Sequence, residues 1–427
     1  MKKLGFVGLA VLLVACSKQI DKQASSVKSP ILPTERISCD FGMSSFNLNK
    51  RAPSYSKGDQ MSRRKKTTGN GNGNGNGGLG GGGTSGGGTT GTDTTGTSTG
   101  SGGTTTPPPS TGGSVILLDF DGDLVSGTPW NSNGDFYCTP ANLTASEISL
   151  IVERVVNDYS PFNITVTTDE SVYNAANTYS RVRVVVTESW EWYGKQVGGV
   201  SYLGSFTSGG DIPSFVFSSL LSYSSKFVAE AVSHEAGHSF GLRHQALYDA
   251  NCVKISDYNY GQGSGEIGWA PIMGSAYSQN LSLWHNGPTS EGCTSLQDDV
   301  AGIAGIVGYR SDDYSNSFAG AASLTGSLAG TISYSNDVDF FSLDVSSSAT
   351  IAVTPFNVGL YNAGANTDLV LKVFTSLGIL VGTIENPSVL DAAVTLWPGS
   401  YYVSVSTTAN PYTSTYGMLG KYTISRN

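Results

Sequence analysis

One stretch decides the fold of this chain: His234-Glu235-Ala236-Gly237-His238-Ser239-Phe240-Gly241-Leu242-Arg243-His244, which holds three of its four histidines. In a helix, side chains four residues apart lie on one face, so His234 and His238 can point at the same ion. Gly241 can adopt a left-handed conformation without a Cβ clash, so we expect the helix to end there and the chain to turn back with His244.

This spacing predicts a catalytic zinc site. The ligands His234, His238 and His244 leave one coordination position open for water, whereas a structural zinc site usually takes four protein ligands. Glu235 follows the first ligand directly and is expected to be a general base, not a ligand. Zinc lowers the pKa of a water molecule toward about 7, and Glu235 would take the proton as that water attacks a carbonyl.

A second motif lies downstream, at Trp269-Ala270-Pro271-Ile272-Met273-Gly274. Together with the extended histidine motif, it resembles the signature of the metzincin zinc endopeptidases. The resemblance implies that Met273 is the residue of a methionine turn beneath the metal. An ordinary buried turn is the alternative for this segment.

Further segments resemble bacterial secreted metzincins of the reprolysin-like kind, over about residues 114–310. They lie at 118–122, 126–131, 158–162, 269–277 and 297–299. The resemblance implies an α/β (α+β) metzincin catalytic domain with a zinc helix and a Met-turn, acting on polypeptide substrates. Independently, apolar patterns predict strands at 115–120, 164–167, 182–186, 197–206 and 214–217, and helices after a capping box at 144–147, from about 225, and over 296–307.

From about residue 315 the pattern changes to alternating strands separated by turn residues, at 339–345, 350–354, 369–374, 394–396 and 401–405. This predicts an all-β sandwich over residues 311–427. The segments 337–341, 398–402 and 416–422 resemble the pre-peptidase C-terminal domain of exported bacterial proteases, which implies a jelly-roll-like accessory module. Some such modules bind calcium; Asp337, Asp339 and Asp368 could hold Ca²⁺, or could lie in exposed turns.

Residues 1–16 resemble a bacterial lipoprotein signal, because a short apolar run ends in the lipobox-like Leu13-Val14-Ala15-Cys16. Acylation of Cys16 would anchor the exported chain to a bacterial membrane, and a plain signal peptide is the alternative. A basic arm over 17–66 and a Gly/Asn/Thr/Ser/Pro-rich linker over 67–113, expected to be disordered, follow. Cutting at Arg63-Arg64-Lys65-Lys66 would release the enzyme to the extracellular space.

Without Cys16, four cysteines remain in a compartment that permits disulfides. We expect Cys252 and Cys293, which bracket Met273, to be bridged, with Cys138 either free or paired to Cys39. A further hypothesis is that the Cys39 thiolate occupies the open zinc position and keeps the enzyme latent.

The charge distribution bears on the class of partner. Residues 1–66 carry 13 Lys and Arg against 4 Asp and Glu, whereas the remainder carries 11 against 29. An acidic folded part without a basic stripe argues against nucleic-acid binding. The sequence therefore predicts a secreted or surface-anchored zinc metalloendopeptidase. The competing hypothesis is a lipid-anchored zinc-binding adhesin with an inactive protease domain, and the retained Glu235 favours the enzyme.

Overall fold

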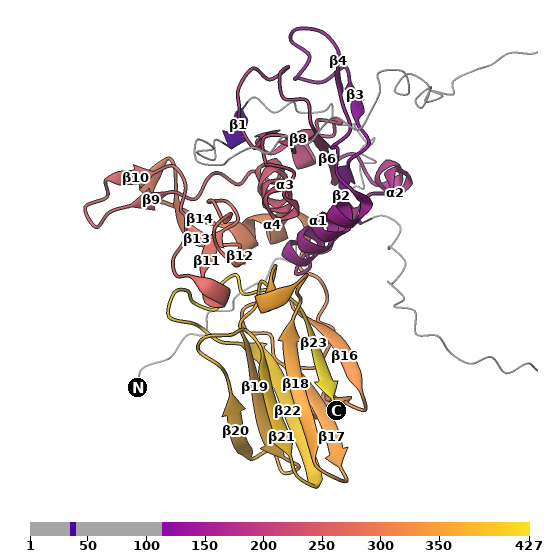
Figure 1. Cartoon of the computed structure of the whole chain (residues 1–427), viewed down its shortest axis with the longest axis vertical. Helices are drawn as coiled ribbons and strands as arrows, with labels where there is room; N and C mark the ends of the chain where they lie inside the picture. Colours follow the sequence, from indigo (N-terminus) through magenta and orange to yellow (C-terminus); the bar gives the residue numbers. More distant parts are fainter. Residues whose placement is uncertain (1–34, 40–112) are drawn as a thin grey trace, which may run out of the picture.

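The computed structural model describes residues 35–39 and 113–427, which form an α/β domain and a β domain stacked end to end (Figure 1). Three predicted features lie outside the described residues: the signal at 1–16 with Cys16, the linker over 67–112, and the basic arm except for 35–39. Within the two described ranges, no helix is long and apolar enough to cross a membrane. The expected combination of mixed α/β content with a β-rich carboxy-terminal part is confirmed.

A six-stranded sheet organises the α/β domain, in the order β1-β7-β8-β6-β2-β5. Strands β8, β6, β2 and β5 run parallel to one another. At one edge, β7 pairs antiparallel with β8, and β1 pairs antiparallel with β7. The bounds are β1 Arg36–Cys39, β2 Ser114–Asp119, β5 Ile164–Thr167, β6 Arg181–Thr187, β7 Gly199–Tyr202 and β8 Ser214–Phe217.

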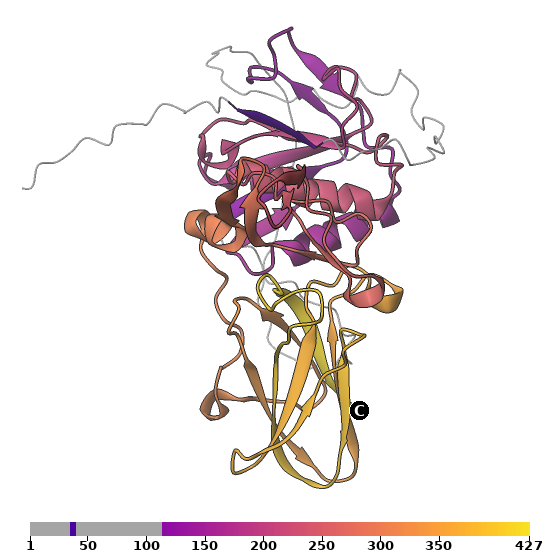
Figure 2. The same cartoon turned by 90° about the vertical axis from the view of Figure 1, so that its left-hand side faces the viewer.

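The sequence predicted five of these strands and missed β1. The strand expected over 197–206 is shorter, because Gly204 adopts a left-handed conformation (φ 73°) and a 3-10 turn, Ser205–Thr207, follows it. Strand β1 escaped prediction because it lies in the basic arm and consists of only four residues. Figure 2 shows β1, in indigo, along the edge of the sheet.

Helices α1 and α3 cover one face of this sheet. α1 (Ala145–Asp158) begins at the predicted capping box, in which Thr144 and Glu147 exchange side-chain and backbone hydrogen bonds. α3 (Ser225–Ser239) carries the first two histidines, and Val155 and Val232 of the two helices pack in one buried cluster with residues of the sheet. The opposite face packs against Trp130, the hairpin β3 (Asp123–Val125) and β4 (Phe136–Cys138), and α2 (Glu170–Ala175).

Short strands connect α3 to the last helix of the domain. They are β9 Leu247–Tyr248, β10 Lys254–Ser256, β11 Trp269–Pro271, β12 Leu281–Leu283, β13 Asn286–Thr289 and β14 Gly292–Asp298. The helix predicted over 296–307 forms, but its predicted start was wrong. Residues up to Asp298 pair with β13, and α4 (Asp299–Val307) begins only where the Asp298 side chain accepts a hydrogen bond from the amide of Ala301.

The predicted disulfide between Cys252 and Cys293 is confirmed, with a Cα–Cα distance of 5.6 Å. It ties the β9–β10 hairpin to the β13–β14 hairpin. Cys138 is free and buried. Of the two predicted alternatives for Cys138, the free thiol is therefore confirmed and the pairing with Cys39 is not. The side chain of Cys39 lies outside the described residues, so its predicted contact with zinc stays a prediction.

The β domain is a sandwich of a five-stranded sheet, β15-β17-β22-β19-β20, and a four-stranded sheet, β16-β23-β18-β21. Phe341 and Val403 of the first sheet share a buried cluster with Val353 and Ile424 of the second. The strands are β15 Ala322–Ser323, β16 Ser327–Ile332, β17 Asp339–Val345, β18 Ala349–Pro355, β19 Leu369–Thr375, β20 Leu380–Ile384, β21 Ala392–Leu396, β22 Gly399–Thr407 and β23 Gly420–Arg426.

The two domains share one continuous buried cluster, which runs from Ile116 to Ile424. Every member of this cluster lies between Ile116 and Ile424, so residues 114–427 contain all of it. Strand β1 pairs with β7 at the edge of the sheet.

Candidate active site

The end of α3 places the three histidines together. His234 and His238 lie one turn apart on the buried side of the helix, which ends at Phe240. Gly241 adopts the predicted left-handed conformation (φ 94°), so the chain turns back toward the helix. As a result, one ring nitrogen from each of His234, His238 and His244 lies within 4.8 Å of the others.

Backbone carbonyls fix the orientation of two of these rings. Nδ1 of His234 lies 2.7 Å from the carbonyl oxygen of Ile272, and Nδ1 of His238 lies 2.6 Å from that of Leu242. A neutral imidazole has one proton, and the carbonyl beside each Nδ1 holds it there. Both Nε2 atoms therefore present lone pairs, and these atoms are 3.0 Å apart.

The histidine cluster fits a zinc ion. Burial lowers the pKa of His234 to about 3 and that of His244 to about 4, and it also holds the pKa of His238 well below its usual value. All three rings are therefore neutral at physiological pH, as metal ligands must be. Two lone pairs at this distance repel each other unless a cation lies between them, and ligand nitrogens on tetrahedral zinc are roughly 3.3 Å apart.

His244 supplies the third nitrogen. Its Nε2 is buried and has no hydrogen-bond partner among the described residues, which is costly unless an ion binds there. The ring of Tyr258, a neighbour that the motif did not reveal, lies 4.5 Å from the His244 ring, centroid to centroid. No spacing rule connects Tyr258 to the motif, so only the fold could reveal this contact.

The Glu235 side chain extends from α3 toward strand β7. Its side chain is fully buried, and a Cβ atom on Gly199 of β7 would lie 2.6 Å from Glu235 Oε1. Only glycine at this point of β7 leaves room for the carboxylate. The amide of Gly204, just past β7, also donates a hydrogen bond of 3.0 Å to the carbonyl of His238. Strand β7 is thus held directly against the buried face of α3.

Met273 lies against the other side of the zinc helix. It is fully buried, and a Cβ atom on Gly237 would lie 2.5 Å from the Met273 sulfur. The amide of Gln245 donates to the Met273 carbonyl at 2.7 Å, so the residue after the third histidine is bonded to this turn. The preceding residue, Ile272, is the one whose carbonyl orients His234.

A buried carboxylate links the zinc helix to the β domain. Asp158, at the end of α1, accepts a hydrogen bond of 2.5 Å from Ser233 Oγ and one of 2.8 Å from Asn366 Nδ2 of the β domain. Burial and the neighbouring Glu230 raise the pKa of Asp158 to about 7, although both hydrogen bonds act to lower it. Since Ser233 immediately precedes His234, the position of His234 is coupled to the domain interface.

Strand β1 occupies the outer edge of β7, next to the histidines. It pairs antiparallel to β7, with Arg36 opposite Tyr202 and Cys39 opposite Gly199. Just before it, Glu35 forms an ion pair with Arg243, the residue between Leu242 and His244. No sequence pattern joins Glu35 to Arg243, because the two residues are 208 positions apart.

Residues 153–245 match the family model of reprolysin-like metallopeptidases of family M12B. The matched segment includes α3 and all three histidines, and it supports a zinc-dependent metallopeptidase. No curated protein matches the chain at a significant level.

Solved structures are similar to parts of the chain. The pre-peptidase C-terminal domain of collagenase from Bacillus anthracis is 16% identical, over 28% of this chain and 98% of that domain, with a TM-score of 0.18. PliG of Aeromonas hydrophila, a periplasmic inhibitor of g-type lysozyme, is 14% identical, over 24% of this chain and 84% of that one, with a TM-score of 0.16. At these TM-scores, the fold assignment rests on the strand topology and not on either likeness.

The β domain holds a second group of candidate ligands. Carboxylate oxygens of Asp312, Asp313 and Asp339 lie within 4.8 Å of one another, and Asp337 adjoins them. Burial raises the pKa of Asp339 to about 8 and that of Asp337 to about 7, and one buried oxygen of each has no hydrogen-bond partner in the described part of the chain. The third residue predicted for calcium, Asp368, is elsewhere: it accepts from Asn410, and its charged neighbours are Glu385 and Glu266.

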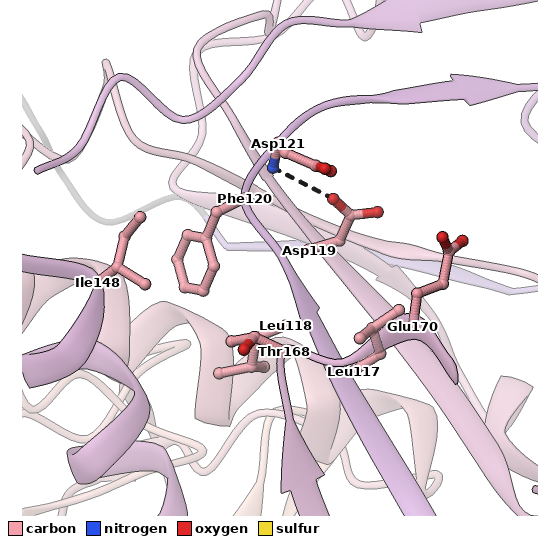
Figure 3. Close-up of a pocket in the computed structure, with 8 residues that line it drawn as sticks. All are labelled: Leu117, Leu118, Asp119, Phe120, Asp121, Ile148, Thr168 and Glu170. Carbon is pink, nitrogen blue, oxygen red and sulfur yellow. Dashed lines mark hydrogen bonds between the residues drawn. The ribbon is translucent and has the colours of Figure 1, made fainter. Parts of the chain in front are cut away.

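A pocket of about 270 Å³ lies at the carboxyl end of β2 (Figure 3). It is lined in part by Asp119, Asp121 and Glu170, and it shares no lining residue with the histidine cluster. Asp119 forms a buried ion pair with Arg183 and accepts a hydrogen bond from the amide of Asp121. Asp119 thus caps the turn that follows β2.

Proposed function

We propose that this chain is a zinc-dependent metalloendopeptidase that hydrolyses peptide bonds of extracellular proteins. The observation that carries the proposal is the convergence of three buried, neutral histidines, two of which turn unprotonated Nε2 atoms toward each other at 3.0 Å. The family match over residues 153–245 supports the same chemistry.

His234, His238 and His244 would hold the ion. Zinc, when bound, would lower the pKa of the attacking water and polarise the peptide carbonyl. Glu235 would take the proton from that water and pass it to the leaving amine nitrogen. Its buried position beside Gly199 of β7 would keep the carboxylate in a site of low dielectric constant.

Two neighbours would support the metal site. Met273 would act as the Met-turn residue, because its side chain packs on Gly237 between the first two ligands. The Ile272 carbonyl would hold the proton on Nδ1 of His234 and so keep Nε2 available for zinc.

The remaining parts of the proposal rest on the sequence. The chain would be exported as a lipoprotein anchored through Cys16 and would be released by cutting within residues 63–66. The β domain would be an accessory module of the pre-peptidase C-terminal type. It would bind Ca²⁺ through Asp337 and Asp339, together with Asp312 and Asp313.

The test compares residues 114–427 with the same protein carrying Glu235→Ala. Zinc content and cleavage of a mixture of denatured proteins are measured on both. We expect about one zinc ion per chain in each, with cleavage that a chelator abolishes and that only the unaltered protein shows. Zinc without cleavage in either protein would favour the zinc-binding adhesin, and absence of zinc would refute the metal site.

A further inference from the structure

Strand β1 covers the outer edge of β7, and its backbone pairing shows how an extended peptide can lie there. The two strands pair over four register positions, and the amide of Leu203 donates a further hydrogen bond of 2.9 Å to the Glu35 carbonyl. These contacts use only backbone atoms, so any extended peptide can form them. The side chains along the bound segment must therefore supply the specificity.

Arg243 makes the best-defined side-chain contact to this segment. Its Nη1 and Nη2 atoms donate to the two carboxylate oxygens of Glu35 at 2.7 and 2.8 Å, the paired geometry that makes arginine selective for carboxylates. The Arg243 and Glu35 side chains are 29% and 49% exposed, so the pair is open to solvent and another acidic residue could replace Glu35.

Arg243 is also held in place without the help of Glu35. Its amide donates to Gln297 Oε1 and its carbonyl accepts from Gln297 Nε2, both at 2.8 Å. Its Nε lies 3.1 Å from Glu291 Oε1 on the β13–β14 hairpin. The guanidinium is thus positioned for a carboxylate before any peptide arrives.

The direction of β1 fixes which part of a substrate meets Arg243. β1 runs from Leu203 toward Gly199, and Gly199 is the residue beside Glu235. A substrate bound with the same polarity therefore places its amino-terminal side at Arg243 and its later residues near the proposed general base. Neighbouring side chains of an extended peptide point to opposite faces, and Arg36 accordingly stacks near Trp130 and Tyr202, away from Arg243.

We propose that Arg243 is a specificity residue, which binds an acidic side chain of the substrate on the amino-terminal side of the cleaved bond. The inference rests on the proposed peptidase function and names the class of peptide that the site prefers. The segment that begins with Glu35 occupies this subsite in the intact chain.

The first experiment measures cleavage preference. Residues 114–427, loaded with zinc, digest a peptide library, and the residues around each cleaved bond are identified by mass spectrometry. We expect Glu and Asp to be enriched at one position amino-terminal to the cleaved bond, with kcat/KM roughly three- to tenfold higher for a Glu peptide than for its Gln counterpart. Arg243→Gln should abolish the enrichment, and Arg243→Glu should shift it to Lys and Arg.

Lys254→Gln is the matched control, because it also removes one exposed positive charge, that of a lysine paired with Asp257. It should leave the preference unchanged. An active enzyme without acidic enrichment, or enrichment that survives in Arg243→Gln, would overturn the inference. If the unaltered protein cleaves nothing, the proposed function fails instead.

A binding measurement separates the two failures further, because it needs no catalysis. A labelled peptide with the sequence of residues 33–40 and Cys39→Ser, which removes the thiol, is titrated onto the Glu235→Ala protein. We expect the peptide to bind roughly three- to tenfold more weakly when it carries Glu35→Gln, and we expect no such difference on Glu235→Ala/Arg243→Gln. Equal affinity for the Glu and Gln peptides on the Glu235→Ala protein would refute the role of Arg243.

Discussion

Replacing Asn366 by alanine should lower the free energy of unfolding, because Asp158, which is buried at the domain interface, would lose a hydrogen-bond donor. The Asn366 amide donates to Asp158 at 2.8 Å, and Asp158 also accepts from Ser233, the residue before the first histidine ligand. In Asn366→Ala, Ser233 would be the only one of these two donors left.

The size of the effect depends on the charge of Asp158. A hydrogen bond to a charged group contributes about 1.5–3 kcal/mol, and one between neutral groups contributes about 1 kcal/mol. Burial raises the pKa of Asp158 to about 7 in the folded protein, from an ordinary value of 3.8. The folded state therefore holds its proton more tightly, and the free energy of unfolding falls as the pH rises from about 4 to about 7.

Loss of the Asn366 donor would raise that pKa further, since this hydrogen bond acts to lower it. The decline in stability would then continue above pH 7. We expect Asn366→Ala to cost about 1 kcal/mol at pH 5 and about 1.5–3 kcal/mol at pH 8. The loss expected at pH 8 corresponds to a decrease in Tm of about 3–6 °C.

Thermal unfolding of zinc-loaded residues 114–427 at the two pH values is the assay. Asn386→Ala serves as the control, because Asn386 is exposed in the same domain and should change stability by less than about 0.5 kcal/mol. An equal loss for Asn366→Ala at pH 5 and pH 8 would show that the ionised carboxylate is not involved.

Three further predictions concern the disulfide, the acidic cluster and the methionine. Cys252→Ser/Cys293→Ser should lower the free energy of unfolding by about 4 kcal/mol, because the disulfide no longer closes a 41-residue loop in the unfolded chain. A reductant should lower the stability of the unaltered protein by the same amount. An unaltered protein whose stability does not change with reductant would contradict this role of the disulfide. Because burial raises the pKa of Asp339 to about 8, stability is lost as the pH rises from about 4 to about 8. Millimolar Ca²⁺ should therefore raise Tm at pH 8 but not at pH 5, and an Asp339→Asn protein that still responds would rule out this site. Met273→Ala should cost about 2–5 kcal/mol, since the side chain is fully buried, and a loss below about 1 kcal/mol in denaturant unfolding would show that the packing on the zinc helix is unimportant.

The sequence was most informative where local chemistry determines the conformation. The spacing of His234 and His238 requires one helical face, and Gly241 supplies the left-handed residue that ends the helix. The capping box that begins with Thr144 marked the start of α1 to the residue. These features depend on neighbours within a few positions, so a single sequence reveals them.

The sequence was least informative where distant residues meet. Nothing near Asp158 indicates that Asn366 will reach it, and nothing near Arg243 points to Glu35, because these contacts depend on how whole elements pack. The same reason explains why Asp368, which the sequence grouped with Asp337 and Asp339, lies apart from them: it precedes β19, and its charged neighbours are Glu385 and Glu266. Positions in the sequence alone do not show which of these distant residues come into contact.

The single added strand β1 also bears on the colloidal behaviour of the enzyme. It satisfies the outer backbone groups of β7, which would otherwise be an open sheet edge beside an apolar cluster that includes Tyr202. An open edge readily pairs with another chain. Protein without residues 35–39 should therefore self-associate as its concentration increases, and a bound peptide should suppress this aggregation. By covering the outer edge of β7, strand β1 would thus also keep the protein monomeric.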